Sequence, residues 1–200
     1  TGSQDPYGLR RQSQGIIRIL ETKDLHLSLQ KLFEKSLSNV TGICPDGDSG
    51  KVYEQIIDFF KDRINNIYID RGYRYDIVES VMKSGFNDIS DLICRLEAIT
   101  KISKTPIWQN LVAGVERTFN IGKNCESDGE VKEDLLEEEE ERKLWAVYKK
   151  EKENLLKHVT PRRYEELSIE YNEAFAKPIH DFFEKVFVNV EDENIKNNRL

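Results

Sequence analysis

The spacing of apolar residues constrains the fold of this chain more than any other feature. Apolar side chains recur at steps of three and four residues through most of its 200 residues, a spacing that places them on one face of an α-helix. The period-two alternation of a half-buried strand never runs beyond four or five residues. The sequence therefore predicts an all-α protein, a helical bundle of about eight to nine helices joined by short turns.

Start and stop signals divide this pattern into helices. A residue that can cap a helix stands directly before a proline, which suits the first helical turn. Three such pairs occur: Asp5-Pro6, Thr105-Pro106 and Thr160-Pro161. Gly72 predicts the end of a long helix over residues 51–71, and the glycines and proline of residues 39–50 predict a loop. The expected inward stripe of the long helix is Val52, Ile56, Phe60, Ile64 and Ile67.

A proline also marks the last apolar segment. Pro178 fits the first position of a helix, because its fixed φ and missing N–H cost nothing there. We therefore expect the chain to kink at residues 176–178 and to start a new helix. The apolar stripe of that helix is Ile179, Phe182, Phe183, Val186 and Phe187.

The helix predicted over residues 106–123 carries the residues of greatest functional interest. Its apolar side chains cluster on one side of a helical wheel, which we expect to face the core: Ile107, Leu111, Val112, Val115 and Phe119. Ala113, Arg117 and Asn120 fall nearly opposite. A small residue beside an arginine and an asparagine leaves room for a backbone phosphate or a base edge. The same two polar residues could instead cap or bridge neighbouring helices.

Charge is unevenly distributed along the chain. The net charge is −7, but residues 1–123 carry 17 basic and 16 acidic side chains, whereas residues 124–200 carry 13 and 21. The acidic half disfavours general coating of nucleic acid, so an RNA contact would need a local basic face. The run Glu137–Glu141 is expected to be a solvated helix face.

The sequence offers little catalytic chemistry. Cys44, Cys94 and Cys125 lie far apart, which predicts plain thiols in a reducing cytosol and no zinc site. No second histidine stands at metal-ligand spacing, and no phosphate loop, nucleophile elbow or dinucleotide fingerprint occurs. No apolar run approaches the roughly 20 residues of a membrane span. The polar start without Met predicts a cytoplasmic fragment of a longer chain, with no signal peptide.

Three separated segments resemble the β subunit of bacterial glycyl-tRNA synthetase, in the order in which they occur there. The first matches a G-S-x-D-P-x-x-L-R-R-x-x-x-G-I-I-R-I motif at residues 2–19, and the second a G-Y-R-Y-D motif at residues 72–76. The third matches a P-I-x-D-F-F-x-x-V helix at residues 178–186, which is followed by V-x-V-x-x-E-D-E-type and N-R-L segments. A further stretch at residues 111–121 resembles DALR-type anticodon-binding domains, with Arg117, Asn120 and Ile121 matching. Glu116 replaces the basic neighbour usual in that motif.

The resemblance implies a function for the whole chain. Residues 1–50 would be helices leading from an absent upstream domain, and residues 51–200 a helical anticodon-binding domain for tRNA(Gly). The implied contacts with tRNA are Arg117, Asn120 and Lys123, with Arg74 and Tyr73 behind them. Tyr73 and Tyr75 could alternatively pack at a helix junction.

The resemblance also implies the partners. The holoenzyme would be an α2β2 glycine–tRNA ligase whose α subunit uses ATP and Mg²⁺, so this part of the β subunit would be non-catalytic and would hold no cofactor or metal. Its partners would be the tRNA, the α subunit and the rest of the β subunit, with no membrane.

Two alternatives stay open. A helical protein–protein interaction module without RNA binding would suit the acidic second half. The related helical domain of arginyl-tRNA synthetase fits the first and last motifs poorly.

Overall fold

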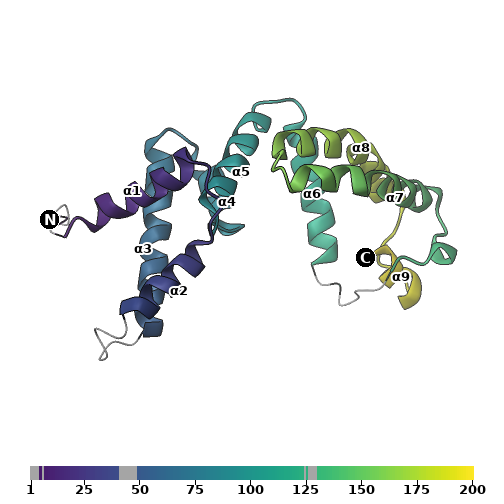
Figure 1. Ribbon diagram of the computed structural model, residues 1–200. Helices are drawn as coiled ribbons and strands as arrows, with labels where there is room; N and C mark the ends of the chain where they lie inside the picture. Colours follow the sequence, from purple (N-terminus) through teal and green to yellow (C-terminus); the bar gives the residue numbers. More distant parts are fainter. Residues whose placement is uncertain (1–4, 6, 41–48, 124, 126–129) are drawn as a thin grey trace. The chain divides into compact units, whose positions relative to one another are not determined.

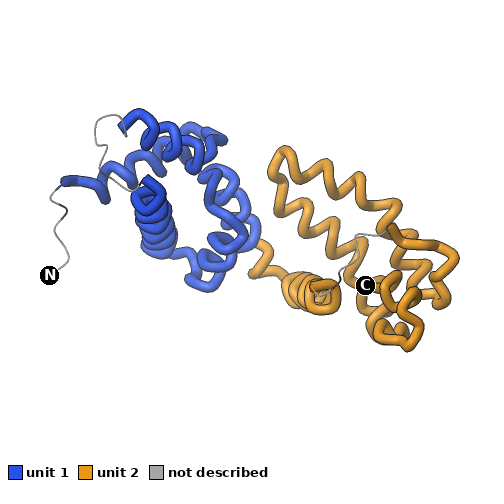
Figure 2. Tube along the Cα trace, turned by 90° about the horizontal axis from the view of Figure 1, so that it is seen from below, with its two compact units in different colours: residues 1–100 blue, residues 101–200 orange. Residues whose placement is uncertain are grey.

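The computed structural model describes residues 5, 7–40, 49–123, 125 and 130–200. Within them the chain forms nine α-helices and one short 3-10 helix, and no strand (Figure 1). This confirms the predicted all-α class. The chain divides into two compact units, residues 1–100 and 101–200, and each is described by itself (Figure 2). The predicted boundary at residue 50, between helices that lead from an upstream domain and an anticodon-binding domain, stays a prediction.

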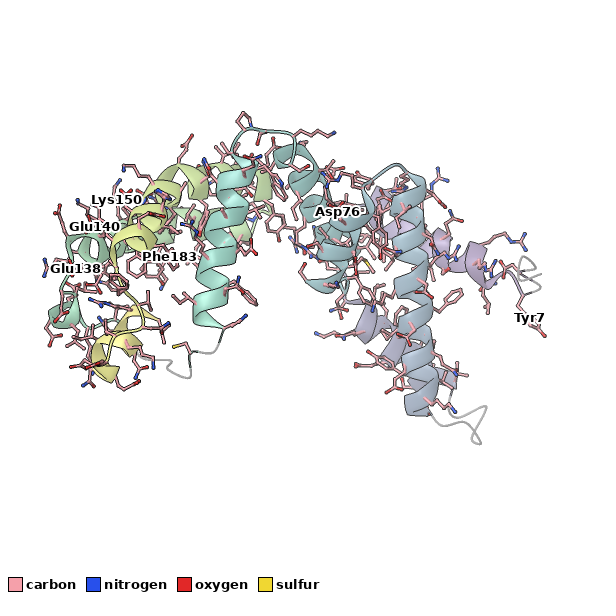
Figure 3. The ribbon with its side chains drawn as sticks, turned by 180° about the vertical axis from the view of Figure 1, so that it is seen from behind. Tyr7, Asp76, Glu138, Glu140, Lys150 and Phe183 are labelled. Carbon is pink, nitrogen blue, oxygen red and sulfur yellow. The ribbon has the colours of Figure 1, made fainter. Side chains whose placement is uncertain are left out.

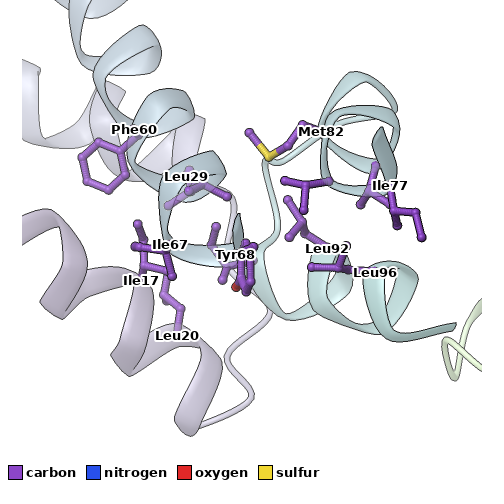
Figure 4. Packing of buried hydrophobic residues seen from close by; sticks show 14 of the residues in the cluster. Ile17, Leu20, Leu29, Phe60, Ile67, Tyr68, Ile77, Met82, Leu92 and Leu96 are labelled. Carbon is purple, nitrogen blue, oxygen red and sulfur yellow. The ribbon is translucent and has the colours of Figure 1, made fainter. Parts of the chain in front are cut away.

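The first unit is built around one long helix. Its elements are α1 (Leu9–Thr22), α2 (Leu29–Val40), α3 (Ser49–Asp70), α4 (Tyr75–Lys83) and α5 (Ile89–Ile102), whose last two residues belong to the second unit. Helices α1, α2 and α4 all pack against α3. Of its predicted stripe, Phe60, Ile64 and Ile67 are buried, together with Tyr68. Val52 is exposed and Ile56 is half-buried, so the predicted stripe holds only in the second half of α3. Figure 4 shows Phe60, Ile67 and Tyr68 in this core.

Polar contacts fix the connections of the first unit. Arg71 donates two hydrogen bonds to Glu21, at 2.5 and 2.9 Å, and so joins α3 to α1. Asp88 caps α5 by accepting from the backbone N–H of Asp91 at 2.9 Å. Arg95 of α5 donates to the carbonyl of Gly85 at 2.7 Å, where a φ of +125° favours glycine.

The second unit is a helical hairpin with two further helices. Its elements are α6 (Trp108–Gly122), the 3-10 helix η1 (Glu133–Leu135), α7 (Glu139–Val159), α8 (Tyr164–Lys185) and α9 (Glu193–Arg199). Helices α7 and α8 form the hairpin, and α6 packs against α8 (Figure 1). A small core of Phe182, Val186 and Val188 receives Ile121 from α6 and Leu200 from the end of the chain.

The expected start of a new helix at Pro178 is wrong, because Pro178 lies inside α8, which runs unbroken from Tyr164 to Lys185. A proline in a helix interior costs about 3 kcal/mol, since it removes one hydrogen bond and crowds the preceding turn. The buried stripe of α8 crosses the proline at steps of four and three, through Phe175, Ile179 and Phe182. Packing along this continuous stripe offsets the local cost.

The predicted inward face of α6 is also wrong. Val112, Val115 and Phe119 are 39%, 49% and 68% exposed. The side of α6 turned toward α8 instead carries Gly114, which is buried, and Ile121. Among the described elements, α8 packs against α6 on the side of Gly114 and Ile121, and this packing leaves Val112, Val115 and Phe119 exposed.

Candidate nucleic-acid interface

Three of the five residues predicted to contact tRNA lie at the C-terminal end of α6, two within the helix and one directly after it. Arg117, Asn120 and Lys123 are all exposed, and we call them the α6 polar edge. At successive steps of three residues they follow one side of the helix toward its C-terminus. The structure therefore places these three predicted side chains together on the surface.

Arg117 is turned toward α8. Its guanidinium lies 4.0 Å from a carboxylate oxygen of Glu184, and its Cζ lies 6.0 Å from the ring centroid of Phe183. Figure 3 shows Phe183 on the side of α8 next to α6. The arginine side chain is 44% exposed and the glutamate 58%, so the pair is long and solvated. Such pairs contribute little, about 0–1 kcal/mol, so an incoming phosphate could displace Glu184 at low cost.

Asn120 and Lys123 contact each other at the end of α6. The ammonium of Lys123 donates to the side-chain oxygen of Asn120 at 3.3 Å. Lys123 directly follows the last residue of α6, where its positive charge interacts favourably with the negative end of the helix dipole. An amide offers both a donor and an acceptor, the combination that a base edge requires.

The other two predicted residues belong to the first unit. The guanidinium of Arg74 donates to both carboxylate oxygens of Asp76, at 3.1 and 2.5 Å, and hydrogen bonding from Arg74 lowers the pKa of Asp76. Tyr73 is half-buried with its ring 6.0 Å from that of Tyr68 at 80°. Burial raises the pKa of the Tyr73 hydroxyl. Tyr73 packs at a helix junction, which was the alternative the sequence left open, whereas Tyr75 is 61% exposed.

Comparisons with known proteins agree over the whole chain. Residues 1–83 match the family model described as glycyl-tRNA synthetase beta subunit, and residues 111–200 match the DALR anticodon binding domain. Glycine–tRNA ligase beta subunits from Clostridioides difficile, Desulforamulus reducens and Halothermothrix orenii are 38%, 35% and 33% identical over 100% of this chain. The chain belongs to the glycyl-tRNA synthetase β-subunit family. It spans 28–29% of the length of these relatives. The α6 polar edge falls inside the part that matches the anticodon-binding domain.

The final motif that resembles this β-subunit family has a structural role in the second unit. Arg199 donates to both carboxylate oxygens of Glu141, at 2.6 and 3.2 Å, and to the carbonyl of Phe187 at 2.9 Å. Asn198 exchanges hydrogen bonds with the backbone of Lys132, accepting at 2.7 Å and donating at 3.1 Å. We call these contacts the α9 latch, because they tie α9 to the start of α7 and to η1.

The α9 latch corrects the prediction for the acidic run. Glu140 and Glu141 are both buried. Glu141 pairs with Arg199, whose side chain is buried with it, whereas Glu140 pairs with Lys185. Burial by itself raises the pKa of Glu141, but the hydrogen bonds from Arg199 and from the backbone N–H of Glu138 outweigh it and lower the pKa. Composition alone could not separate these two glutamates from their solvated neighbours.

The remaining predictions concern metal, thiol and membrane chemistry. In the described part of the chain, no three metal-ligating side chains come together. Cys94 and Cys125 are half-buried and unbridged, while Cys44 lies outside the described residues. None of the described helices is both long enough and apolar enough to span a membrane.

Proposed function

We propose that this chain provides the anticodon-arm recognition of a glycyl-tRNA synthetase. The observation that carries the proposal is the match of residues 111–200 to the DALR anticodon binding domain, where the α6 polar edge is exposed. The RNA is tRNA(Gly), the substrate of the ligase named by its relatives. The protein-only interaction module has no comparable support.

The roles follow from the chemistry of each side chain. Arg117 and Lys123 supply cations for backbone phosphates, which position the RNA without reading its sequence. Asn120 supplies an amide for the edge of an unpaired base, which does carry sequence information. Arg74 and Tyr73 of the first unit are further candidates: Arg74 would leave Asp76 to meet a phosphate, whereas the half-buried Tyr73 would contribute only through its exposed atoms.

The chemistry of aminoacylation belongs elsewhere in this proposal. An α subunit would join glycine to tRNA with ATP and Mg²⁺ in an α2β2 enzyme of the cytoplasm. This chain, with the rest of the β subunit, would hold the tRNA in place. We assign no step of that chemistry to its residues.

Filter binding of tRNA(Gly) at two salt concentrations tests the proposal. Replacement Arg117→Ala should weaken binding at fixed salt by about 1–3 kcal/mol if the arginine contacts a base, and less if it contacts a phosphate only. The control is Lys150→Ala, which removes an exposed lysine paired with Glu151 on α7 (Figure 3).

Two outcomes count against parts of this proposal. An unchanged affinity of Arg117→Ala would remove Arg117 from the interface. Wild-type affinity that is weak and insensitive to salt would favour the protein-binding module over RNA recognition.

A further inference from the structure

Two phenylalanines of the second unit are exposed to solvent. Phe119 of α6 is 68% exposed, and Phe187, directly after α8, is 82% exposed. Burying a phenylalanine contributes about 1.5–3 kcal/mol, and neither side chain realises this within its unit. Both positions would hold a polar residue at no cost to the core.

The orientation of Phe187 follows from its neighbours. Val186 has the extended backbone angles φ −101° and ψ 122°. Val186 and Val188 are each only 6% exposed, because both point into the second core. Successive side chains of an extended segment point to opposite sides. Because Val186 and Val188 point into the core, Phe187 between them points toward solvent.

The end of α6 and the segment that carries Phe187 lie at the same end of the second unit, and the two rings point away from the core they flank: Phe119 lies on the side of α6 nearly opposite Ile121. Ile121, two residues after Phe119, packs in the core formed by Val186 and Val188. The end of α6 is therefore adjacent to the segment that carries Phe187. On the wheel of α6, Lys123 lies between Phe119 and Asn120, so the exposed ring borders the α6 polar edge.

We propose that Phe119 and Phe187 are stacking platforms for unpaired bases of the RNA loop held by the α6 polar edge. This inference rests on the proposed function and names the residues that would supply most of its affinity. Aromatic rings bind bases by stacking whatever the base, and each such contact is worth about 1–3 kcal/mol.

Charge and hydrogen bonding favour a nucleic acid over a protein partner at this end. Asn120 and Lys123 adjoin Phe119, and a second cation, Arg117, lies one turn before Asn120 on the side of α6 toward α8. Two neighbouring carboxylates already have partners, because Glu184 faces Arg117 and Asp192 accepts from the backbone of α9 at 2.8 Å. Glu116, exposed between Phe119 and Asn120 on the wheel of α6, is the one acidic side chain of α6 at this patch, and it disfavours a phosphate there but not a stacked base. Cations, amide and flat apolar rings are together the inventory of a site for single-stranded RNA.

The test uses the full chain and the tRNA(Gly) anticodon stem-loop with 2-aminopurine in the loop. Phe119→Leu and Phe187→Leu keep an apolar side chain but remove the ring, and each should weaken binding about 5- to 150-fold. Phe119→Tyr should bind like wild type. The change in 2-aminopurine fluorescence on binding should be smaller in the leucine variants.

Salt separates stacking from phosphate contacts. The ratio of wild-type to Phe119→Leu affinity should be the same at low and high salt, whereas Arg117→Ala should reduce the salt dependence. Val115→Ala is the matched control, because Val115 lies one turn earlier on the same face and is 49% exposed. It should leave affinity unchanged, and all variants should keep the wild-type melting temperature.

The outcomes distinguish this inference from the proposed function. If the wild-type chain binds the stem-loop with salt dependence but both leucine variants bind equally well, stacking is overturned and RNA recognition stands. A loss in Val115→Ala as large as that in Phe119→Leu would also overturn stacking, in favour of general hydrophobic docking. A wild-type chain that binds no RNA would overturn both.

Discussion

Arg199 and Glu141 form an ion pair that is almost wholly out of solvent, with 4% and 1% of their side chains exposed. Such a pair contributes little beyond what an apolar pair would, but losing one partner leaves a buried charge uncompensated. Arg199 also holds the carbonyl of Phe187, so the α9 latch fixes the segment that presents Phe187. The terminal motif therefore stabilises the segment that presents Phe187.

Replacement Arg199→Leu should therefore destabilise the second unit by about 3–5 kcal/mol, because Glu141 would remain buried without its partner. Thermal or urea unfolding monitored by circular dichroism measures the effect. Arg117→Leu is the matched control, since its ion pair with Glu184 is long and exposed. Equal stability of the two variants would contradict the role given to the α9 latch.

Acid should weaken the same contact. The pKa of Glu141 is lowered in the folded chain, so its contribution to the free energy of unfolding is fully present above its unfolded pKa of about 4.3. That contribution is lost as pH falls through the lower, native pKa. Glu141→Gln should show a shallower loss of stability below about pH 4.3 than wild type. The free energies of unfolding of both proteins are measured by urea unfolding at several pH values. An equally steep fall below about pH 4.3 in wild type and Glu141→Gln would refute this assignment.

Helix α8 shows how packing overrides a local signal at the scale of elements. Its buried stripe continues through Pro178 because Phe175, Ile179 and Phe182 lie on one face. Helix α6 shows the complementary case, since its most apolar face stays exposed while α8 covers the side with Gly114 and Ile121. In both helices the neighbouring element decided the outcome.

The cost of the proline should be measurable. Pro178→Ala restores an N–H and removes the crowding of the preceding turn, so it should raise the free energy of unfolding by about 1–3 kcal/mol. Thermal unfolding measures this change in stability. Ala176→Gly, which destabilises the same helix, provides a change of known sign for comparison. A destabilised Pro178→Ala would mean that the buried stripe depends on the local geometry of the proline.

The whole molecule carries its charge in a way that limits RNA binding. Residues 124–200 hold 21 acidic against 13 basic side chains, and the α6 polar edge offers only two cations. We therefore infer that few phosphates are bound and that stacking supplies much of the affinity. Such an interface would favour a loop over a duplex, because only unpaired bases expose their faces.

The salt dependence of tRNA binding should be correspondingly shallow. The two cations of the α6 polar edge by themselves predict a slope of log affinity against log salt of about −1.4, or roughly a sevenfold loss between 50 and 200 mM, and a contact from Arg74 would steepen the slope to about −2. Filter binding over that range measures it. A slope several times steeper would place further phosphate contacts outside the α6 polar edge.

The helical class, the family and the buried half of the α3 stripe could be predicted from the sequence, because each depends on spacing or order along the chain. The sequence also brought Arg117, Asn120 and Lys123 to one exposed edge, since three-residue steps fix their relation on a helix. Three features depend on packing between elements and could not be predicted: which face of α6 is covered, the continuation of α8 through Pro178, and the burial of Glu141 by Arg199. The spacing of residues predicts which side chains share a helix face. Whether that face is buried depends on a neighbouring element that is distant in the sequence.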